Sequence, residues 1–162
     1  MFRFYLAILL AGLSLPAVAE TQVERGKYLA EIMTCNECHT PGALLGKPDK
    51  NNPLAGSEVG YEIPMLGIFY GANLTPDTET GIGSWTADQI VTAIRTGVRP
   101  DGRVLSAAMP WRSFAALTDK DAKAIAAYLK SLKPMSRKVP GPFGPSEKAT
   151  SFYYGFVMPP KK

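Results

Sequence analysis

Apolar residues recur with a helical period in the second half of the chain. After Thr118 they stand at i, i+3, i+4, i+7 and i+10, from Ala122 to Leu132, and form one apolar face. Acidic residues in the first turn complement the helix dipole, and Pro134 cannot continue a helix. The pattern therefore predicts an amphipathic helix that follows Thr118 and ends near Lys133.

Two further helices are predicted from their expected N-terminal caps. Thr21, with Glu24 three residues later, fits a capping box, and the helix that it begins should run to about Met33. Thr86 begins a second helix in the same way, with an apolar stripe after it. Gly97 stands where a glycine commonly follows the last turn.

The parts between and after these helices are irregular. Residues 40–85 are rich in proline and glycine, and a loop of that length argues against a core made of protein alone. We expect a large bound cofactor to fill the middle. Residues 134–162 hold six prolines and five aromatic residues, which predicts a strap packed on the domain or on a partner.

The N-terminal residues have the pattern of a secretory signal peptide. Arg3 precedes a short apolar run over residues 4–15, and Ala17 and Ala19 form a cleavage site. We expect residues 1–19 to be removed, which gives an exported, soluble, periplasmic chain. The alternative is an uncleaved anchor, but the run is too short to span a bilayer as a helix. No transmembrane segment is expected in the mature chain, which then divides into a domain over residues 20–133 and an extension over residues 134–162.

Composition narrows the possible functions. A length of 162 residues suits one domain, and 46% hydrophobic residues can build a core. The net charge of +4 is modest, and no basic run long enough for a nucleic-acid site is present. Two cysteines and one histidine exclude a four-ligand Cys/His zinc site and a dense disulfide framework.

The cysteines and the histidine stand together in one motif. Cys35, Cys38 and His39 form a C-x-x-C-H pattern, which is typical of c-type haem attachment. The two thiols can form thioethers with the haem vinyl groups, and the imidazole that follows can ligate the iron. The motif predicts one covalently bound haem c.

Three other interpretations of the C-x-x-C-H motif fit the sequence less well. A thioredoxin-like dithiol belongs in a βαβ context, which is missing, and leaves His39 without a role. A disulfide between Cys35 and Cys38 closes a very small loop. Half of a zinc site lacks its remaining ligands.

The sixth ligand of the iron is expected to be a methionine, because the chain has no second histidine. Met109 is favoured, because it lies in an irregular stretch between two predicted helices and Pro110 stiffens that stretch. Met65 is the second choice. The other candidates after residue 19 are Met33, Met135 and Met158.

With these residues in view, the chain resembles a class I c-type cytochrome. It is most similar to the single-haem domains that serve as electron-transfer subunits or partners of periplasmic dehydrogenases. The haem motif alone indicates only the cofactor. The other segments restrict which subfamily of these cytochromes the chain resembles. The segments that carry the resemblance are residues 26–29 (GKYL), 35–39 (CNECH), 73–77 (NLTPD), 80–86 (TGIGSWT), 101–103 (DGR), 109–111 (MPW) and 127–129 (AYL).

The resemblance implies a mainly α, class I cytochrome c-like domain around a covalently attached haem. It implies that Cys35 and Cys38 attach the haem and that His39 and Met109 are the axial ligands. The long tail departs from the minimal family pattern.

The resemblance also implies contacts around the haem. The first and last helices should cross closely at Gly26, with Tyr128 nearby. A proline carbonyl should orient the imidazole of His39, and Pro53 and Pro64 are both possible donors of that carbonyl.

Several side chains are possible donors to the haem propionates. The alternative for each is an ordinary core tryptophan or a solvated arginine. The candidates are Trp85, Trp111, Arg95, Arg99 and Arg112.

The expected function is electron transfer rather than catalysis. Iron with two protein ligands has no open site for a substrate, so it passes single electrons, here from a dehydrogenase to a respiratory acceptor. One alternative is a tightly bound subunit of a dehydrogenase complex, with the tail as its docking element. Another is a haem enzyme or gas-binding protein with a displaceable sixth ligand. From its position after the last helix, the tail is expected not to be needed to hold the haem.

Overall fold

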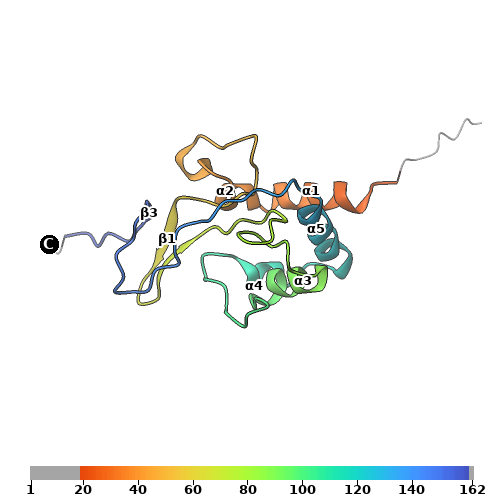
Figure 1. Ribbon diagram of the computed structural model, residues 1–162. Helices are drawn as coiled ribbons and strands as arrows, with labels where there is room; N and C mark the ends of the chain where they lie inside the picture. Colours follow the sequence, from red (N-terminus) through yellow and green to blue (C-terminus); the bar gives the residue numbers. More distant parts are fainter. Residues whose placement is uncertain (1–18, 161–162) are drawn as a thin grey trace, which may run out of the picture.

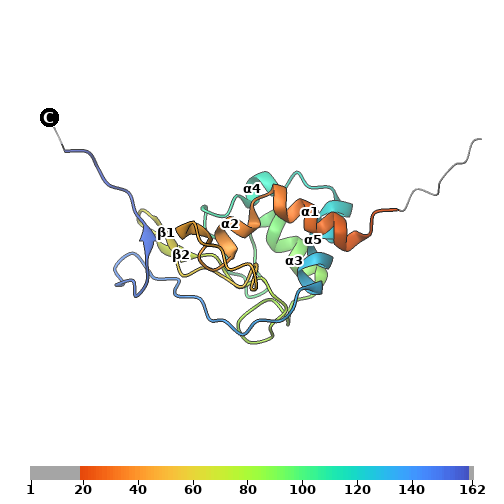
Figure 2. The same ribbon diagram turned by 90° about the horizontal axis from the view of Figure 1, so that it is seen from above.

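A computed structural model of the chain describes residues 19–160. Its helices gather at one end of the molecule, and a small three-stranded sheet lies at the other end (Figures 1 and 2). The tail runs from the helical end to the sheet end. The expected signal peptide lies outside the described residues, apart from its last position. Within the described part, no helix has both the length and the apolar character needed to cross a membrane.

The three helices expected from their caps are confirmed. They are α1 (Gln22–Ile32), α3 (Ala87–Thr96) and α5 (Asp119–Ser131). Thr21 and Thr86 each form a complete capping box, because the side chain of the third helical residue accepts a hydrogen bond from the N–H of the cap residue. At the other ends, α1 and α5 stop one and two residues short of the expected positions.

Helices α1 and α5 pack against each other at a glycine, as expected. A Cβ atom at Gly26 would lie 1.9 Å from the carbonyl oxygen of Ala124 and 2.8 Å from the Cβ of Tyr128. Only a residue without a side chain allows this approach of the two backbones. The buried apolar residues around the crossing form the core, which includes Leu29, Ala30, Leu54, Ile82, Ile90, Ile125, Ala126 and Leu129.

The region between α1 and α3 holds short elements that the sequence did not indicate. They are α2 (Cys35–His39), η1 (Ala43–Leu45), and the antiparallel strands β1 (Gly60–Ile63) and β2 (Gly67–Tyr70). A further short helix, α4 (Trp111–Phe114), lies between α3 and α5. Each has only three to five residues, which is too short for apolar periodicity to show.

The tail returns along the molecule and joins the sheet. Strand β3 (Tyr153–Tyr154) pairs in parallel with β1, so the order in the sheet is β2-β1-β3. On the way, Phe143 exchanges backbone hydrogen bonds with Ile68 of β2. The last aromatic side chains are exposed, with Phe152 and Phe156 each above 70%.

Candidate functional site

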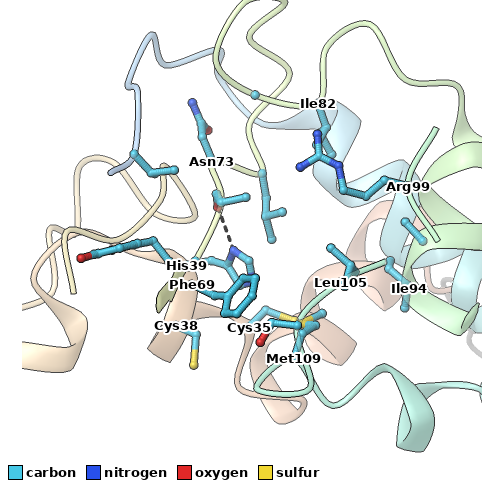
Figure 3. Close-up of a pocket in the computed structure, with 18 of the residues that line it drawn as sticks. Cys35, Cys38, His39, Phe69, Asn73, Ile82, Ile94, Arg99, Leu105 and Met109 are labelled. Carbon is cyan, nitrogen blue, oxygen red and sulfur yellow. Dashed lines mark hydrogen bonds between the residues drawn. The ribbon is translucent and has the colours of Figure 1, made fainter. Parts of the chain in front are cut away.

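One cavity of about 300 Å³ brings the chemically distinctive residues together. Cys35, Cys38, His39 and Met109 all line it, although Met109 is far from the others in sequence (Figure 3). The remaining wall is mainly apolar and comes from α3, α5, β2 and the loops beside them. The predicted site residues therefore share one enclosed space.

The local structure of the motif explains how its side chains reach the cavity. Thr34 has a left-handed backbone, with φ of 57°, which turns the chain sharply after α1. The next five residues form the single turn of α2, so Cys35 and His39 lie four residues apart on one face. Both cysteines are free thiols rather than a disulfide.

The ring of His39 is fixed by a backbone carbonyl. His39 is 9% exposed, and its Nδ1 lies 2.7 Å from the carbonyl oxygen of Ala72. Because the partner can only accept, Nδ1 carries the proton, and the other ring nitrogen keeps a free lone pair. A ring held in this way is ready to ligate a metal through that second nitrogen.

The expectation that Pro53 or Pro64 supplies this carbonyl is wrong. Pro64 lies in the turn between β1 and β2, whereas the loop after β2 passes directly beside the motif. A Cβ at Gly71 would lie 1.7 Å from the carbonyl oxygen of Cys38, so only glycine permits this contact. Gly71 thus brings the next residue, Ala72, to the imidazole.

Burial keeps the motif in its neutral forms. It raises the pKa of the Cys35 thiol to about 11. It also lowers the pKa of His39, against the opposing effect of the hydrogen bond to Ala72. A redox-active dithiol needs a depressed thiol pKa, so the raised value at Cys35 argues against that alternative.

Among the methionines, the structure favours Met109 for a role in the cavity. It precedes α4, and its own backbone is held by bonds from Met109 N to Ser106 O (3.0 Å) and from Trp111 N to Met109 O (2.8 Å). Met65 is 90% exposed in the turn between β1 and β2, and Met158 is 85% exposed. Neither of these two side chains can reach a group bound in the cavity unless the chain rearranges.

Two other methionines are placed differently. Met33 lines the cavity too, but it comes from the end of α1, two residues before Cys35. Met135 lies on the tail, where its backbone carbonyl accepts a hydrogen bond from Asn73.

Two arginines give the cavity a positive side. Arg99 (Figure 3) and Arg103 both line it. Arg99 also stacks over the ring of Trp85, with 5.4 Å between Cζ and the ring centroid. The Nε of Arg99 is buried and has no hydrogen-bond partner within residues 19–160. Burial and the neighbouring Arg99 lower the pKa of Arg103. Arg99 also forms an ion pair with Asp101, with 3.2 Å between Nη2 and Oδ2, so its Nε is the donor that is left for a further carboxylate.

Only some of the expected propionate donors lie at the cavity. Trp85 and Arg99 lie at the cavity, but Arg95 forms an ion pair with Asp119 of α5. Arg112 lies over the ring of Trp111, 4.3 Å from its centroid. The sequence reasoning missed Arg103, although it belongs to the segment 101–103 that carries part of the resemblance.

Taken together, the residues fit a haem c. The cavity offers apolar walls for the ring, two thiols for thioethers, an oriented imidazole, a thioether sulfur and two cations for carboxylates. The described part of the chain holds no group of three or more His, Cys, Asp and Glu side chains that could bind a metal ion. Iron held by a macrocycle needs no such group.

The chain also matches known proteins. Residues 21–129 match a family described as "Cytochrome C oxidase, cbb3-type, subunit III". The chain is 40% identical over 119 residues to the cytochrome c subunit of a quinone alcohol dehydrogenase from Gluconobacter oxydans. It is 38% identical over 136 residues to the cytochrome c subunit of gluconate 2-dehydrogenase from Pantoea cypripedii, and 38% identical over 113 residues to a dihaem c-type cytochrome from Cereibacter sphaeroides.

These matches cover most of this chain but little of the relatives. The aligned parts are 72%, 79% and 66% of this chain. They are only 23%, 28% and 34% of the three relatives. The chain therefore spans about a third or less of the length of each of these three relatives.

Proposed function

The chain belongs to this c-type cytochrome family, and we propose that it carries single electrons through one haem c attached at Cys35 and Cys38. The observation that carries the proposal is the oriented His39 ring, held by Ala72 at the wall of a cavity that also contains both thiols and Met109. When bound, the haem supplies an iron that alternates between the ferrous and ferric states.

The protein residues have separate roles in this proposal. The two thiols hold the cofactor covalently, so a small apolar pocket is enough to retain it. His39 would bind the iron, and its bond to Ala72 fixes the ring and raises its basicity. Met109 would supply the second protein ligand. With two protein ligands, the iron would have no open site for a substrate, which fits an electron carrier rather than an enzyme.

Arg99 and Arg103 are proposed to bind the haem propionates. Both are cations at the cavity, and the Nε of Arg99 has no partner within the described residues. A carboxylate there would satisfy this donor and reduce the repulsion between the two guanidinium groups. Of the earlier candidates, Trp85 stays a proposed neighbour through its contact with Arg99.

The site is tested by the optical spectra of the exported protein, oxidised and reduced. A haem c with His and Met ligands should give sharp reduced bands and a weak long-wavelength band in the oxidised form. The colour should remain with the protein after extraction with acid and acetone, because thioether bonds survive it. A colourless protein after extraction would contradict attachment at the two cysteines.

The proposed partner is a dehydrogenase, and the proposed location is the periplasm. The relatives support the proposed partner, since two of them are named as cytochrome c subunits of an alcohol and of a gluconate dehydrogenase. The same names favour the second possibility, a tightly held subunit instead of a free carrier. Purification under gentle conditions separates the two, because a subunit should elute with a larger protein and a free carrier should elute alone.

A further inference from the structure

We propose that the first part of the tail, residues 135–142, belongs to the haem site, and that Asn73 is the positioning residue that joins it to His39. The inference rests on the proposed haem at this cavity. It gives the tail a role at the site, although the tail is still expected not to be needed to hold the haem. Three sets of contacts carry it: the side chain of Asn73, the wall formed by residues 139–142, and the anchors on either side of that wall.

The side chain of Asn73 links the tail to the loop that holds the imidazole. Asn73 is 1% exposed and directly follows Ala72. Its Nδ2 donates to the carbonyl of Met135 at 2.7 Å and to the hydroxyl of Thr80 at 3.1 Å. Its Oδ1 accepts from the N–H and the hydroxyl of Thr75, at 2.9 and 2.7 Å. A buried amide used so fully fixes the backbone on both sides of it.

The tail then forms part of the cavity wall. Val139, Pro140, Gly141 and Pro142 all line the cavity. Val139 also packs on Gly56, because a Cβ added to Gly56 would lie 2.3 Å from Cγ1 of Val139. The N–H of Gly56 in turn donates to the carbonyl of His39 at 2.7 Å. The tail thus packs on a segment that is hydrogen-bonded to the backbone of His39. Asn73 in turn holds the tail next to Ala72.

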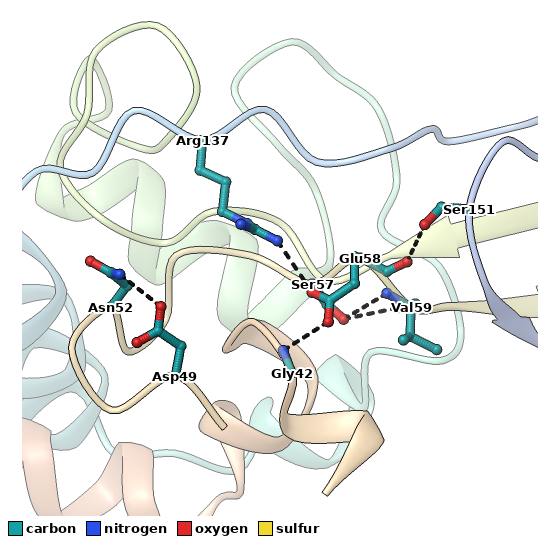
Figure 4. Close-up of polar contacts among 8 residues, drawn as sticks. All are labelled: Gly42, Asp49, Asn52, Ser57, Glu58, Val59, Arg137 and Ser151. Atoms are coloured by element: carbon teal, nitrogen blue, oxygen red, sulfur yellow. Dashed lines mark hydrogen bonds and ion pairs between the residues drawn. The ribbon is translucent and has the colours of Figure 1, made fainter. Parts of the chain in front are cut away.

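Other anchors keep the wall in place on either side. Arg137 forms an ion pair with Glu58 at 3.2 Å, and the other carboxylate oxygen of Glu58 accepts from the N–H of Gly42 (Figure 4). Beyond the wall, the hydroxyl of Ser151 donates to the carbonyl of Glu58 at 2.6 Å. These contacts tie the tail to the loop after the haem motif, so residues 135–142 have little freedom to swing away.

A wall of this kind has a physical consequence at the ligand. Val139 and Pro140 are half-buried and apolar, and proline has no N–H, so these two residues reduce the access of water to their side of the cavity. With less water there, the bond between His39 and Ala72 has less competition, and a lower dielectric disfavours the more highly charged ferric state. The tail should therefore slow exchange of the ring N–H of His39 with solvent and raise the reduction potential.

Two truncations of the full-length exported holoprotein test this. One ends after Lys133 and removes the whole tail. The matched control ends after Phe143 and keeps the Asn73 contacts, the Arg137 ion pair, the wall and the bridge to Ile68, but loses the Ser151 contact and β3. For each, the fraction of covalently bound haem is measured by acid-acetone extraction, the exchange of the His39 ring N–H by NMR of the ferrous form, and the midpoint potential by redox titration.

The proposal expects the two truncations to differ. The chain that ends after Lys133 should keep its covalent haem, but its His39 ring N–H should exchange at least about tenfold faster and its potential should be lower. The chain that ends after Phe143 should match the full chain. Equal behaviour of the two truncations, whether both changed or both unchanged, would overturn the proposal. A full-length chain without covalent haem would instead contradict the proposed function.

A point variant covers the case in which the shorter chain does not fold. Asn73→Asp keeps the oxygen that accepts from Thr75 but places an acceptor where Nδ2 donates to Met135. It should show the faster ring N–H exchange and the lower potential with the whole tail present. Ser136→Ala, on an exposed tail residue, is the control and should change neither value. An Asn73→Asp protein that behaves like the full chain in both measurements would refute the role of Asn73.

Discussion

Arg25 of α1 and Asp121 of α5 form an ion pair across the crossing of the two helices, with 2.9 Å between Nε and Oδ1. The other oxygen of Asp121 accepts from the hydroxyl of Thr118, also at 2.9 Å. The hydrogen bond from Arg25, followed by that from Thr118, lowers the pKa of Asp121. One carboxylate thus holds the side chain of Thr118, the N-cap residue of α5, and connects this helix to α1.

This pair should make stability depend on pH. Because the pKa of Asp121 is lower in the folded protein than in the unfolded chain, its contribution is present above the unfolded value, about 3.9, and is lost as the pH falls below it. Asp121→Asn should therefore lower the midpoint of thermal unfolding at pH 7, and the difference from wild type should shrink toward pH 3. Asp88→Asn, at an exposed position in the first turn of α3, is the control. A difference that does not change with pH would contradict the linkage.

A methyl group at the helix crossing should be strongly destabilising. In Gly26→Ala the new Cβ would overlap the carbonyl of Ala124, so α1 and α5 must move apart. We expect the free energy of unfolding to fall by about 3 kcal/mol or more, measured by denaturant titration. Gly144→Ala is the matched control, because its Cβ would meet only a side chain at 3.6 Å. A small effect at Gly26 would mean that the helices adapt without loss.

Local signals explain why the helices were predictable. Thr21, Thr86 and Thr118 each cap a helix through contacts with the following three residues, and such contacts are visible in the sequence. The C-x-x-C-H motif is local in the same sense, since Cys35 to His39 need only one turn of helix. Features of this kind do not depend on how distant segments meet.

The features that sequence reasoning missed depend on distant contacts. The partner of His39 is the backbone carbonyl of Ala72, which carries no side-chain signal, and it is brought there by Gly71. Arg103 was not among the expected propionate donors, and it reaches the cavity only through the path of its loop. The strands β1 and β2 are four residues each and show no clear alternation.

Removal of both thiols should abolish covalent haem. Cys35→Ala with Cys38→Ala leaves no sulfur for a thioether, because the chain has only two cysteines. The variant should lose all of its colour on extraction with acid and acetone, whereas wild type should keep it. A single Cys35→Ala variant, with one thioether still possible, serves as the intermediate control. Retained colour in the double variant would show that the haem is attached elsewhere.

Loss of a cation at the cavity should shift the potential downward. Arg103→Gln removes a positive charge from beside the proposed propionates, and the ferric state, which carries one more positive charge, then gains relative to the ferrous state. Redox titration should give a lower midpoint potential than in wild type. Lys123→Gln, on the exposed side of α5, changes the net charge equally and should have little effect. Equal shifts of the potential in the two variants would mean that Arg103 does not lie closer to the haem than Lys123 does.

The sixth ligand can be identified by comparing two methionines. Met109→Ala should abolish the weak long-wavelength band of the oxidised protein, because that band reports the bond between sulfur and iron. It should also lower the midpoint potential, since a soft thioether favours ferrous iron, and the ferrous protein should then bind carbon monoxide. Met65→Ala is the matched control, because that side chain is 90% exposed in the turn between β1 and β2. It should keep the band, the potential and the resistance to carbon monoxide. If the band instead disappears in Met65→Ala and survives in Met109→Ala, the turn must fold over the cavity in the loaded protein, and Met65 is the ligand.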